Sequence, residues 1–83
     1  MKTAFVTGGS RGIGSAIALA LGKTFHVVVG FANSEDKAND VVKEIVAAGG
    51  SASTVQIDIS DAVSVDNAFT TIEKEYNSVD VLI

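Results

Sequence analysis

Cysteine and proline are absent from the chain, and histidine occurs once, as His26. Without cysteine the protein can form neither disulfides nor thiolate metal sites, and a single histidine excludes a histidine-based metal cluster. We therefore expect no bound metal. With 83 residues and no covalent staple, the fold has to be held by an apolar core, for which the hydrophobic content of 47% is sufficient.

Positive charge is scarce as well. Six Lys and Arg residues against ten Asp and Glu residues give a net charge of −4, and the cations are spread along the chain. Nucleic-acid binding depends on clustered cations, so we expect no nucleic-acid partner. No apolar run approaches the roughly 20 residues that span a bilayer, and a strand-like segment begins at once, where a secretory signal would have a charged and then an apolar region. These features predict a cytoplasmic protein without a membrane partner.

Short apolar segments alternate with segments of helical periodicity. Apolar or β-branched segments predict four strands, at residues 2–7, 27–29, 52–59 and 79–83. Three intervening helices are predicted by apolar stripes, formed by Ile13, Ile17, Ala20 and Leu21, by Ala38, Val41, Val42 and Ile45, and by Val65, Ala68, Phe69 and Ile72. The order β-α-β-α-β-α-β predicts an α/β fold, a doubly wound parallel sheet of the Rossmann type.

Residues that begin or end helices stand at the borders of these segments. Gly22 and the pair Gly49-Gly50 predict the ends of the first two helices, since glycine accepts the left-handed conformation that follows a helix. Asn33 or Ser34 can cap the second helix. For the third helix, the candidate caps are Ser60 and Asp61.

Between the first strand and the first helix stands the sequence Thr7-Gly8-Gly9-Ser10-Arg11-Gly12-Ile13-Gly14. Glycines at 8, 12 and 14 can adopt positive φ and carry no Cβ, so main-chain N–H groups can approach phosphate oxygens. The helix that follows points its positive end at the anion. A P-loop would need Lys and Ser or Thr where Ser15-Ala16 stand, and the common Gly-x-Gly-x-x-Gly spacing is also absent. The loop therefore predicts a nucleotide diphosphate site of a different type.

The segment from Thr7 to Gly14 resembles the cofactor loop of the short-chain dehydrogenase/reductase family, and the resemblance extends over residues 2–83. Ser10 to Gly14 and Phe31 to Ser34 are most similar to β-ketoacyl-carrier-protein reductases. The resemblance implies strand order 3-2-1-4 and a nicotinamide dinucleotide cofactor. It also implies that residues 1–83 are the N-terminal part of one dinucleotide-binding domain, truncated after the fourth strand, because the family's catalytic Ser and Tyr-x-x-x-Lys are absent.

Within the loop, the resemblance implies a separate role for each matched residue. The hydroxyl of Thr7 helps to fix the loop, and Gly8 makes the turn. Gly12 and Gly14 allow close approach of the phosphates and of the helix. The residues expected against the adenosine ribose and the pyrophosphate are Ser10 and Ile13. For Ser10, a turn residue that bonds to its own backbone remains the alternative.

Selection between NAD and NADP depends on the end of the second strand. A carboxylate there accepts hydrogen bonds from the adenosine ribose hydroxyls of NAD and repels the additional phosphate of NADP. This chain has Ala32 and Asn33 at that place. Arg11 resembles the basic residue that pairs with the 2′-phosphate in NADP-preferring relatives, with a solvated surface cation as the alternative. Because Asn33 and Ser34 could also donate to that phosphate, we predict NADP (NADPH) as cofactor in preference to NAD.

The third strand is followed by Asp58 and Ile59. In the family, an Asp at this place accepts from the adenine amino group, and the backbone N–H of its neighbour meets the ring. The alternative for Asp58 is helix capping, for which Ser60 and Asp61 are better placed. His26 has no partner at a recognisable spacing, which favours a structural role.

The resemblance implies an NADP(H)-dependent oxidoreductase that reduces a carbonyl to an alcohol, with a 3-oxoacyl thioester as one candidate substrate. The chain would be the cofactor-binding portion, without catalytic residues and inactive alone, and the complete protein would be a homo-oligomer. Two alternatives remain open. One is a non-catalytic nucleotide-binding or regulatory protein, and the other is a structural fragment whose sheet a partner chain completes.

Overall fold

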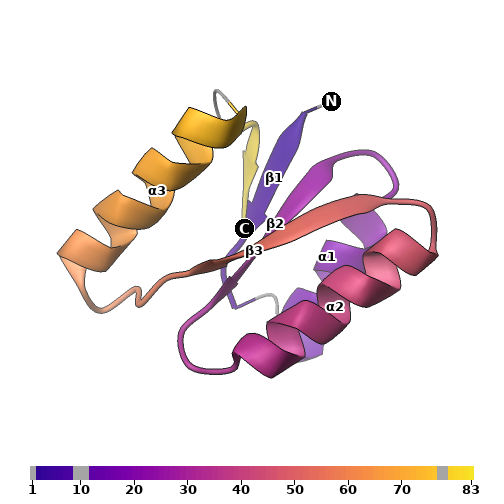
Figure 1. Ribbon diagram of the computed structural model, residues 1–83, viewed down its shortest axis with the longest axis horizontal. Helices are drawn as coiled ribbons and strands as arrows, with labels where there is room; N and C mark the ends of the chain where they lie inside the picture. The colour runs from indigo at the N-terminus through magenta and orange to yellow at the C-terminus, as the bar shows by residue number, and fades with distance from the viewer. Residues whose placement is uncertain (1, 9–11, 77–78) are drawn as a thin grey trace.

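The computed structural model describes residues 2–8, 12–76 and 79–83 (Figure 1). Within these residues, strands and helices alternate along the chain. The strands are β1 (Thr3–Val6), β2 (His26–Phe31), β3 (Ser51–Gln56) and β4 (Val81–Leu82). The helices are α1 (Gly12–Leu21), α2 (Glu35–Ala47) and α3 (Ala62–Tyr76). The predicted α/β class is confirmed.

All described strand pairs are parallel, and the sheet has the order β3-β2-β1-β4, which is the order that the resemblance implies. β1 lies between β2 and β4, with Thr3 opposite His26 and Ala4 opposite Val81. Parallel strands require crossover connections, which the helices supply. The carboxyl ends of the strands consequently lie at one edge of the sheet.

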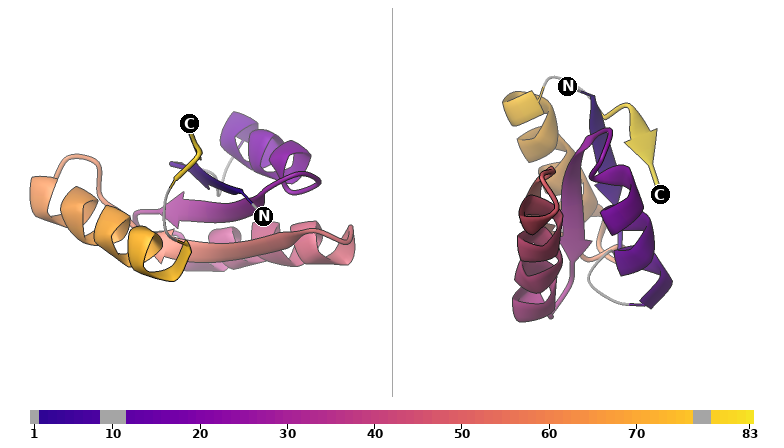
Figure 2. Two further views of the ribbon diagram at one scale, coloured as in Figure 1. Left: turned by 90° about the horizontal axis from the view of Figure 1, so that it is seen from above. Right: turned by 90° about the vertical axis from the view of Figure 1, so that its right-hand side faces the viewer.

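Both faces of the sheet are covered, and alternate residues of β2 point to opposite faces. Val27 and Val29 pack with Ala18 of α1 and with Ile45 of α2. Val28 packs on the other face, in a cluster that includes Phe5 of β1 together with Ala68 and Ile72 of α3. Figure 2 shows β2 between α1 and α3 in both of its views. The continuous Val27 to Val29 run is therefore buried on both faces, as expected for a strand inside a parallel sheet.

The predicted stripes of α2 and α3 are confirmed, and that of α1 is partly wrong. Ala38, Val41 and Ile45 of α2 are buried. Among the α1 residues whose burial the structure describes, Ala18 is fully buried, whereas Ala20 is exposed. Because α1 contacts both the sheet and α2, its buried face is rotated relative to the simple stripe.

The expected helix ends are confirmed at Gly49-Gly50 and at Asp61. Ser34 is the N-cap residue of α2 but makes no side-chain cap hydrogen bond, and Gly22 does not have the positive φ expected after α1. Gly49 has a φ of 90°, and the N–H of Gly50 donates to the carbonyl oxygen of Ile45 at 2.9 Å, which closes α2 as a Schellman motif. At the start of α3, Oδ1 of Asp61 accepts from the N–H of Val63 at 3.0 Å, so Asp61 is the cap.

Three strands are shorter than predicted, and β1, at Thr3–Val6, lies within the predicted residues 2–7. β3 ends at Gln56, because the chain turns after Ile57, where the N–H of Asp61 donates to the carbonyl oxygen of Asp58 at 3.0 Å. β4 is assigned at Val81–Leu82 alone, within the predicted residues 79–83.

Candidate functional site

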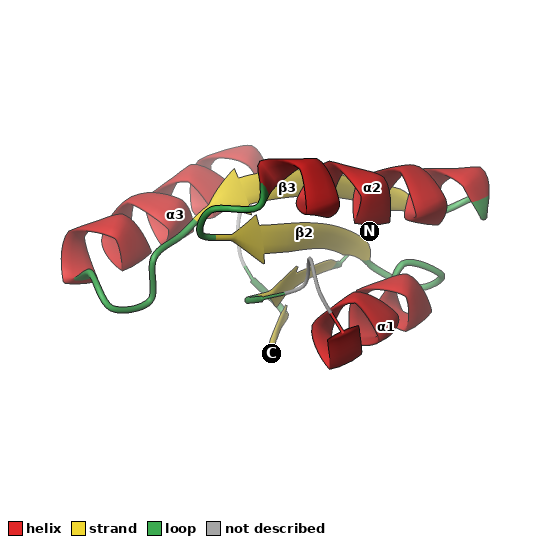
Figure 3. Ribbon diagram, turned by 90° about the horizontal axis from the view of Figure 1, so that it is seen from below, coloured by secondary structure: helices red, strands yellow, loops and turns green. Residues whose placement is uncertain are grey.

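Three loops lie along the carboxyl edge of the sheet. Thr7 and Gly8 follow β1, residues 32–34 follow β2, and residues 57–61 follow β3. Figure 3 shows β2 and β3 ending at the same end of the sheet, where their loops continue to α2 and α3. The parallel topology therefore gathers segments that are far apart in the sequence.

A cavity of about 230 Å³ lies at this edge. Its lining residues come from all three loops and are Thr7, Gly8, Phe31, Ala32, Ile57, Asp58 and Ile59. Five of them, Thr7, Gly8, Ala32, Asp58 and Ile59, are sequence-predicted site residues. The structure thus brings together the predicted residues of three loops around one opening.

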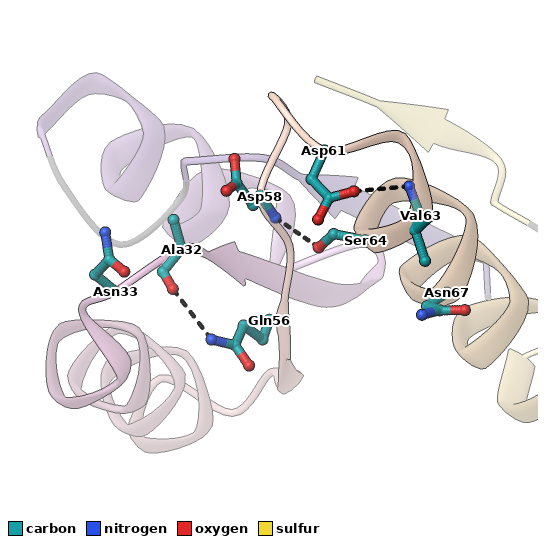
Figure 4. A pocket seen from close by; sticks show the side chains of 8 residues that line it. All are labelled: Ala32, Asn33, Gln56, Asp58, Asp61, Val63, Ser64 and Asn67. Atoms are coloured by element: carbon teal, nitrogen blue, oxygen red, sulfur yellow. Dashed lines mark hydrogen bonds between the residues drawn. The ribbon is translucent and has the colours of Figure 1, made fainter.

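A larger hollow of about 420 Å³ adjoins the first cavity, and Ala32 and Asp58 line both of them. Its remaining lining residues are Asn33, Gln56, Asp61, Val63, Ser64 and Asn67 (Figure 4). Ser34 lines a third hollow, of about 320 Å³, together with Asn33 and Lys37. The predicted loop after β2 therefore borders on all three openings.

Thr7 joins the site to β4. Its backbone N–H and its hydroxyl both donate to the carbonyl oxygen of Ile83, at 2.9 and 2.8 Å. Through these bonds Thr7 connects the end of β1 to Ile83, the residue that follows β4.

The glycines of the loop differ in their conformations. Gly8 and Gly12 have φ values of 65° and 52°, which confirms the predicted positive φ at both places. Among the described residues, and apart from the chain neighbours, a Cβ at either position would meet no atom within 4 Å. Gly14 lies inside α1 and is not among the described glycines with positive φ, so it does not use the conformational freedom that the sequence offers there.

Three residues of the loop lie outside the described residues, and the side chain of Ile13 is not described either. These three are Gly9, Ser10 and Arg11. The roles expected for Ser10, Arg11 and Ile13 therefore stay predictions.

The first turns of α1 and α2 differ in charge. α1 has no acidic residue in its first turn, whereas α2 has Glu35 and Asp36 there. No carboxylate in the first turn of α1 offsets the positive end of its dipole. In α2, two carboxylates of the first turn do. An anion is therefore better accommodated at the start of α1.

Asp58 is held by two serines. Its Oδ1 accepts from the hydroxyl of Ser60 at 2.6 Å and from the N–H of Ser60 at 3.0 Å. The Asp58 N–H donates to Oγ of Ser64 at 2.9 Å. The hydroxyl of Ser60, and then its N–H, hold the pKa of the Asp58 carboxyl below its ordinary value. The carboxyl is therefore an ionised acceptor at neutral pH, and the capping of α3 falls to Asp61 instead.

Gln56, Ser60 and Ser64 make contacts at the site that the sequence pattern did not predict. Nε2 of Gln56 donates to the carbonyl oxygen of Ala32 at 3.3 Å, which joins β3 to the loop after β2. Ser60 and Ser64 hold Asp58. The only available signal was the density of hydroxyl and amide side chains after the third strand, since the contacts themselves depend on how the loops fold.

His26 lies at the opposite, amino end of β2. Its Nδ1 lies 2.6 Å from Oγ of Ser51, and its Nε2 lies 3.1 Å from Oγ of Ser53. Burial lowers the pKa of His26, and the negative charge of Glu75 opposes this. The contacts with β3 agree with the predicted structural role.

Within the described residues, no three His, Cys, Asp or Glu side chains are grouped so that they could hold a metal ion. None of the described helices is long and apolar enough to cross a membrane.

Parallel strands in this order, with openings at their carboxyl edge, define a Rossmann-type α/β chain. A sequence profile described as short chain dehydrogenase matches residues 2–83. A 3-oxoacyl-(acyl-carrier-protein) reductase of a Synechocystis species is 46% identical over 83 residues, which are 99% of this chain and 34% of that protein. The chain therefore belongs to the short-chain dehydrogenase family.

Solved structures agree with this assignment. A metagenomic short-chain oxidoreductase in complex with NADP has a TM-score of 0.92 and 39% identity, covering 98% of this chain and 37% of that chain. A short-chain dehydrogenase from Burkholderia cenocepacia J2315, also in complex with NADP, has a TM-score of 0.87 and 40% identity, over 98% of this chain and 34% of that chain. The chain spans about a third of the length of the relatives that it matches.

Proposed function

We propose that residues 1–83 form the N-terminal part of one dinucleotide-binding domain, in an NADP(H)-dependent oxidoreductase that reduces a carbonyl to an alcohol. The observation that carries this proposal is the cavity at the carboxyl edge, where residues from the loops after β1, β2 and β3 meet. In doubly wound sheets, ligands bind outside the carboxyl ends of the strands. The two NADP complexes among the similar structures support the choice of cofactor.

The residues at this edge fit a dinucleotide. Gly8 and Gly12 leave open space where a side chain would stand, so their backbones can approach phosphate oxygens. α1 presents its positive end without an acidic residue in its first turn. Asp58 supplies an ionised acceptor, and the exposed side chain of Ile59 supplies an apolar contact for a flat ring. Thr7, Ser10, Ile13 and Gly14 complete this set as the resemblance implies.

Selection of NADP over NAD is assigned to two loops. The loop after β2 has no acidic residue at Ala32 to Ser34, so nothing in those three positions repels a 2′-phosphate. Arg11 supplies a cation whose fork geometry suits a phosphate. Asn33 and Ser34 line the same hollow as Lys37, and Glu35 and Asp36 line it too, so two donors and a second cation are available there beside two carboxylates.

When bound, the nicotinamide supplies the hydride, and this chain holds the adenosine and pyrophosphate portions. A 3-oxoacyl thioester is the first substrate to test, because the 46% identical relative is named as a 3-oxoacyl-(acyl-carrier-protein) reductase. The cytoplasmic location and the homo-oligomeric state of the complete protein stay predictions.

The test is made on the full-length protein. We expect NADPH to bind more tightly than NADH by fluorescence titration, and NADPH absorbance to fall when a 3-oxoacyl thioester is added. Binding without turnover of any carbonyl substrate would favour the non-catalytic nucleotide-binding alternative. Failure to bind either dinucleotide would overturn the proposal.

A further inference from the structure

The carboxylate of Asp58 is fixed in direction by contacts that the sequence pattern does not predict. Both bonds from Ser60, through its hydroxyl and its N–H, reach the same oxygen, Oδ1. Ser64 holds the main chain of Asp58 from the other side, through the Asp58 N–H. Figure 4 shows the carboxylate pointing away from Ser64. The aspartate is thus restrained at both its backbone and its side chain.

The second carboxylate oxygen of Asp58, Oδ2, has no hydrogen-bond donor among the described residues. An ionised carboxylate has about four acceptor positions, so Oδ2 can accept a further N–H. Asp58 lines both the 230 Å³ cavity and the adjoining 420 Å³ hollow. The available acceptor therefore belongs to a residue that borders both openings.

We propose that Ser60 is a positioning residue for recognition of the adenine 6-amino group. Its hydroxyl occupies Oδ1 of Asp58 and holds the carboxylate so that Oδ2 accepts from that amino group, while Ser64 fixes the backbone. This inference rests on the proposed function, since it takes Asp58 as the adenine acceptor of the bound dinucleotide. Ser60 then acts through Asp58 and does not itself touch the ring.

A role in helix capping does not account for the Ser60 contact. The N-terminus of α3 is already capped by Asp61, whose Oδ1 accepts from Val63 and whose carbonyl oxygen accepts from the N–H of Val65. Both Ser60 and Asp58 are exposed, so neither needs the other as a buried hydrogen-bond partner. The short 2.6 Å bond instead lowers the rotational freedom of an exposed carboxylate.

The test compares NADPH with the analogue that carries hypoxanthine in place of adenine, in the full-length protein. Hypoxanthine presents an acceptor oxygen where adenine has its amino donor, so an acceptor at Oδ2 favours NADPH. We expect Ser60→Ala to reduce this preference by about threefold to tenfold, the range of one hydrogen bond. Ser60→Thr keeps the hydroxyl and should keep the preference. Thr70→Ala removes an exposed hydroxyl of α3 that lines neither opening, and is the matched control.

A pH profile separates positioning from a merely structural effect. Because Ser60 lowers the pKa of Asp58, Ser60→Ala should move the acid limb of NADPH binding to higher pH, and Ser60→Thr should not. Suppose that Asp58→Asn loses the preference for NADPH over the hypoxanthine analogue, but that Ser60→Ala changes neither this preference nor the acid limb of NADPH binding. That result would overturn the role of Ser60 and leave the proposed function standing. Equal affinities of the wild-type protein for the two dinucleotides would instead overturn the role of Asp58 in the proposed function.

Discussion

The hydroxyl of Thr7 donates to the carbonyl oxygen of Ile83 across 2.8 Å, although the two residues are 76 positions apart in the sequence. The N–H of Thr7 donates to the same oxygen at 2.9 Å, and the N–H of Ile83 donates to Phe5. The start of the glycine loop is thereby anchored to the residue that follows β4. A disturbance of this contact should affect both the sheet and the loop.

Replacing Thr7 by Val removes the hydroxyl and keeps the shape of the side chain. We expect the free energy of unfolding to fall by about 0.5–1.5 kcal/mol, the net contribution of one hydrogen bond. Urea unfolding of the full-length protein measures this change. Thr7→Ser retains the donor and should lose less stability than Thr7→Val; a larger loss in the Ser variant would contradict the assigned role of the hydroxyl.

Most of the fold could be predicted from short patterns. The run Val27 to Val29 predicted a strand buried on both faces, and the spacing of Ala38, Val41 and Ile45 predicted the buried face of α2. Such patterns succeed because each depends on one period within one element. Ala20 was assigned to the wrong face, because the burial of α1 depends on two neighbours at once.

The site could be predicted only where backbone conformation or strand position determined it. Gly8 and Gly12 were expected because positive φ favours glycine, and Asp58 because the family resemblance implies an acceptor after the third strand. The contacts of Gln56 and Ser60 were not found, because each depends on the path of a loop and on the side-chain rotamer. Serine and glutamine carry no pattern that distinguishes such contacts from ordinary surface positions.

Gly30 of β2 packs closely against its neighbours inside the sheet, which the strand pattern did not predict. A Cβ on this residue would lie 2.9 Å from Cε1 of Phe5 and 3.1 Å from Cγ2 of Ile57. We expect Gly30→Ala to destabilise the protein by about 1–3 kcal/mol, as overpacking of a core does. The measurement is urea unfolding, with Phe5→Leu as a second background. Because Leu removes the clashing ring atom, Gly30→Ala should lower the free energy of unfolding less in the Phe5→Leu background. An equal loss in both backgrounds would mean that the clash with Phe5 is not the cause.

His26 should make stability depend on pH. Its pKa is lowered below the ordinary value of 6.5 in the folded state, so the unfolded chain binds the proton more readily. The stabilising contribution of neutral His26 is therefore fully present above pH 6.5. It decreases as the pH falls through 6.5 and is lost below the folded-state pKa of His26. Denaturant titrations at about pH 7.5 and 5.5 avoid most of the carboxyl titrations. The loss of stability between the two pH values should be smaller in His26→Gln than in the wild-type protein. An identical loss would mean that groups other than His26 cause it.

Ala32 offers a test of cofactor selection at the end of β2. Its side chain is exposed and lines both openings, so a larger residue can be accommodated there. We expect Ala32→Asp to shift the preference toward NADH by about tenfold or more, because a carboxylate repels the 2′-phosphate and accepts from the ribose hydroxyls. Ala32→Asn has nearly the same shape without the charge and should shift it much less. Titrations with both dinucleotides give the ratio of the NADPH and NADH affinities. An unchanged ratio in Ala32→Asp would mean that this loop does not contact the 2′-phosphate.

Arg11 is the residue on which the NADP prediction depends most. Replacing it by Ala removes a cation that is proposed to pair with the 2′-phosphate, so NADPH affinity should fall by about tenfold or more, the scale of a charge-assisted hydrogen bond. NADH lacks that phosphate, and its affinity should change by less than about twofold. Lys23→Ala removes the same charge from an exposed position beyond the other end of α1 and controls for net charge. If Arg11→Ala weakened NADPH and NADH equally, Arg11 would support the loop and would not select the cofactor.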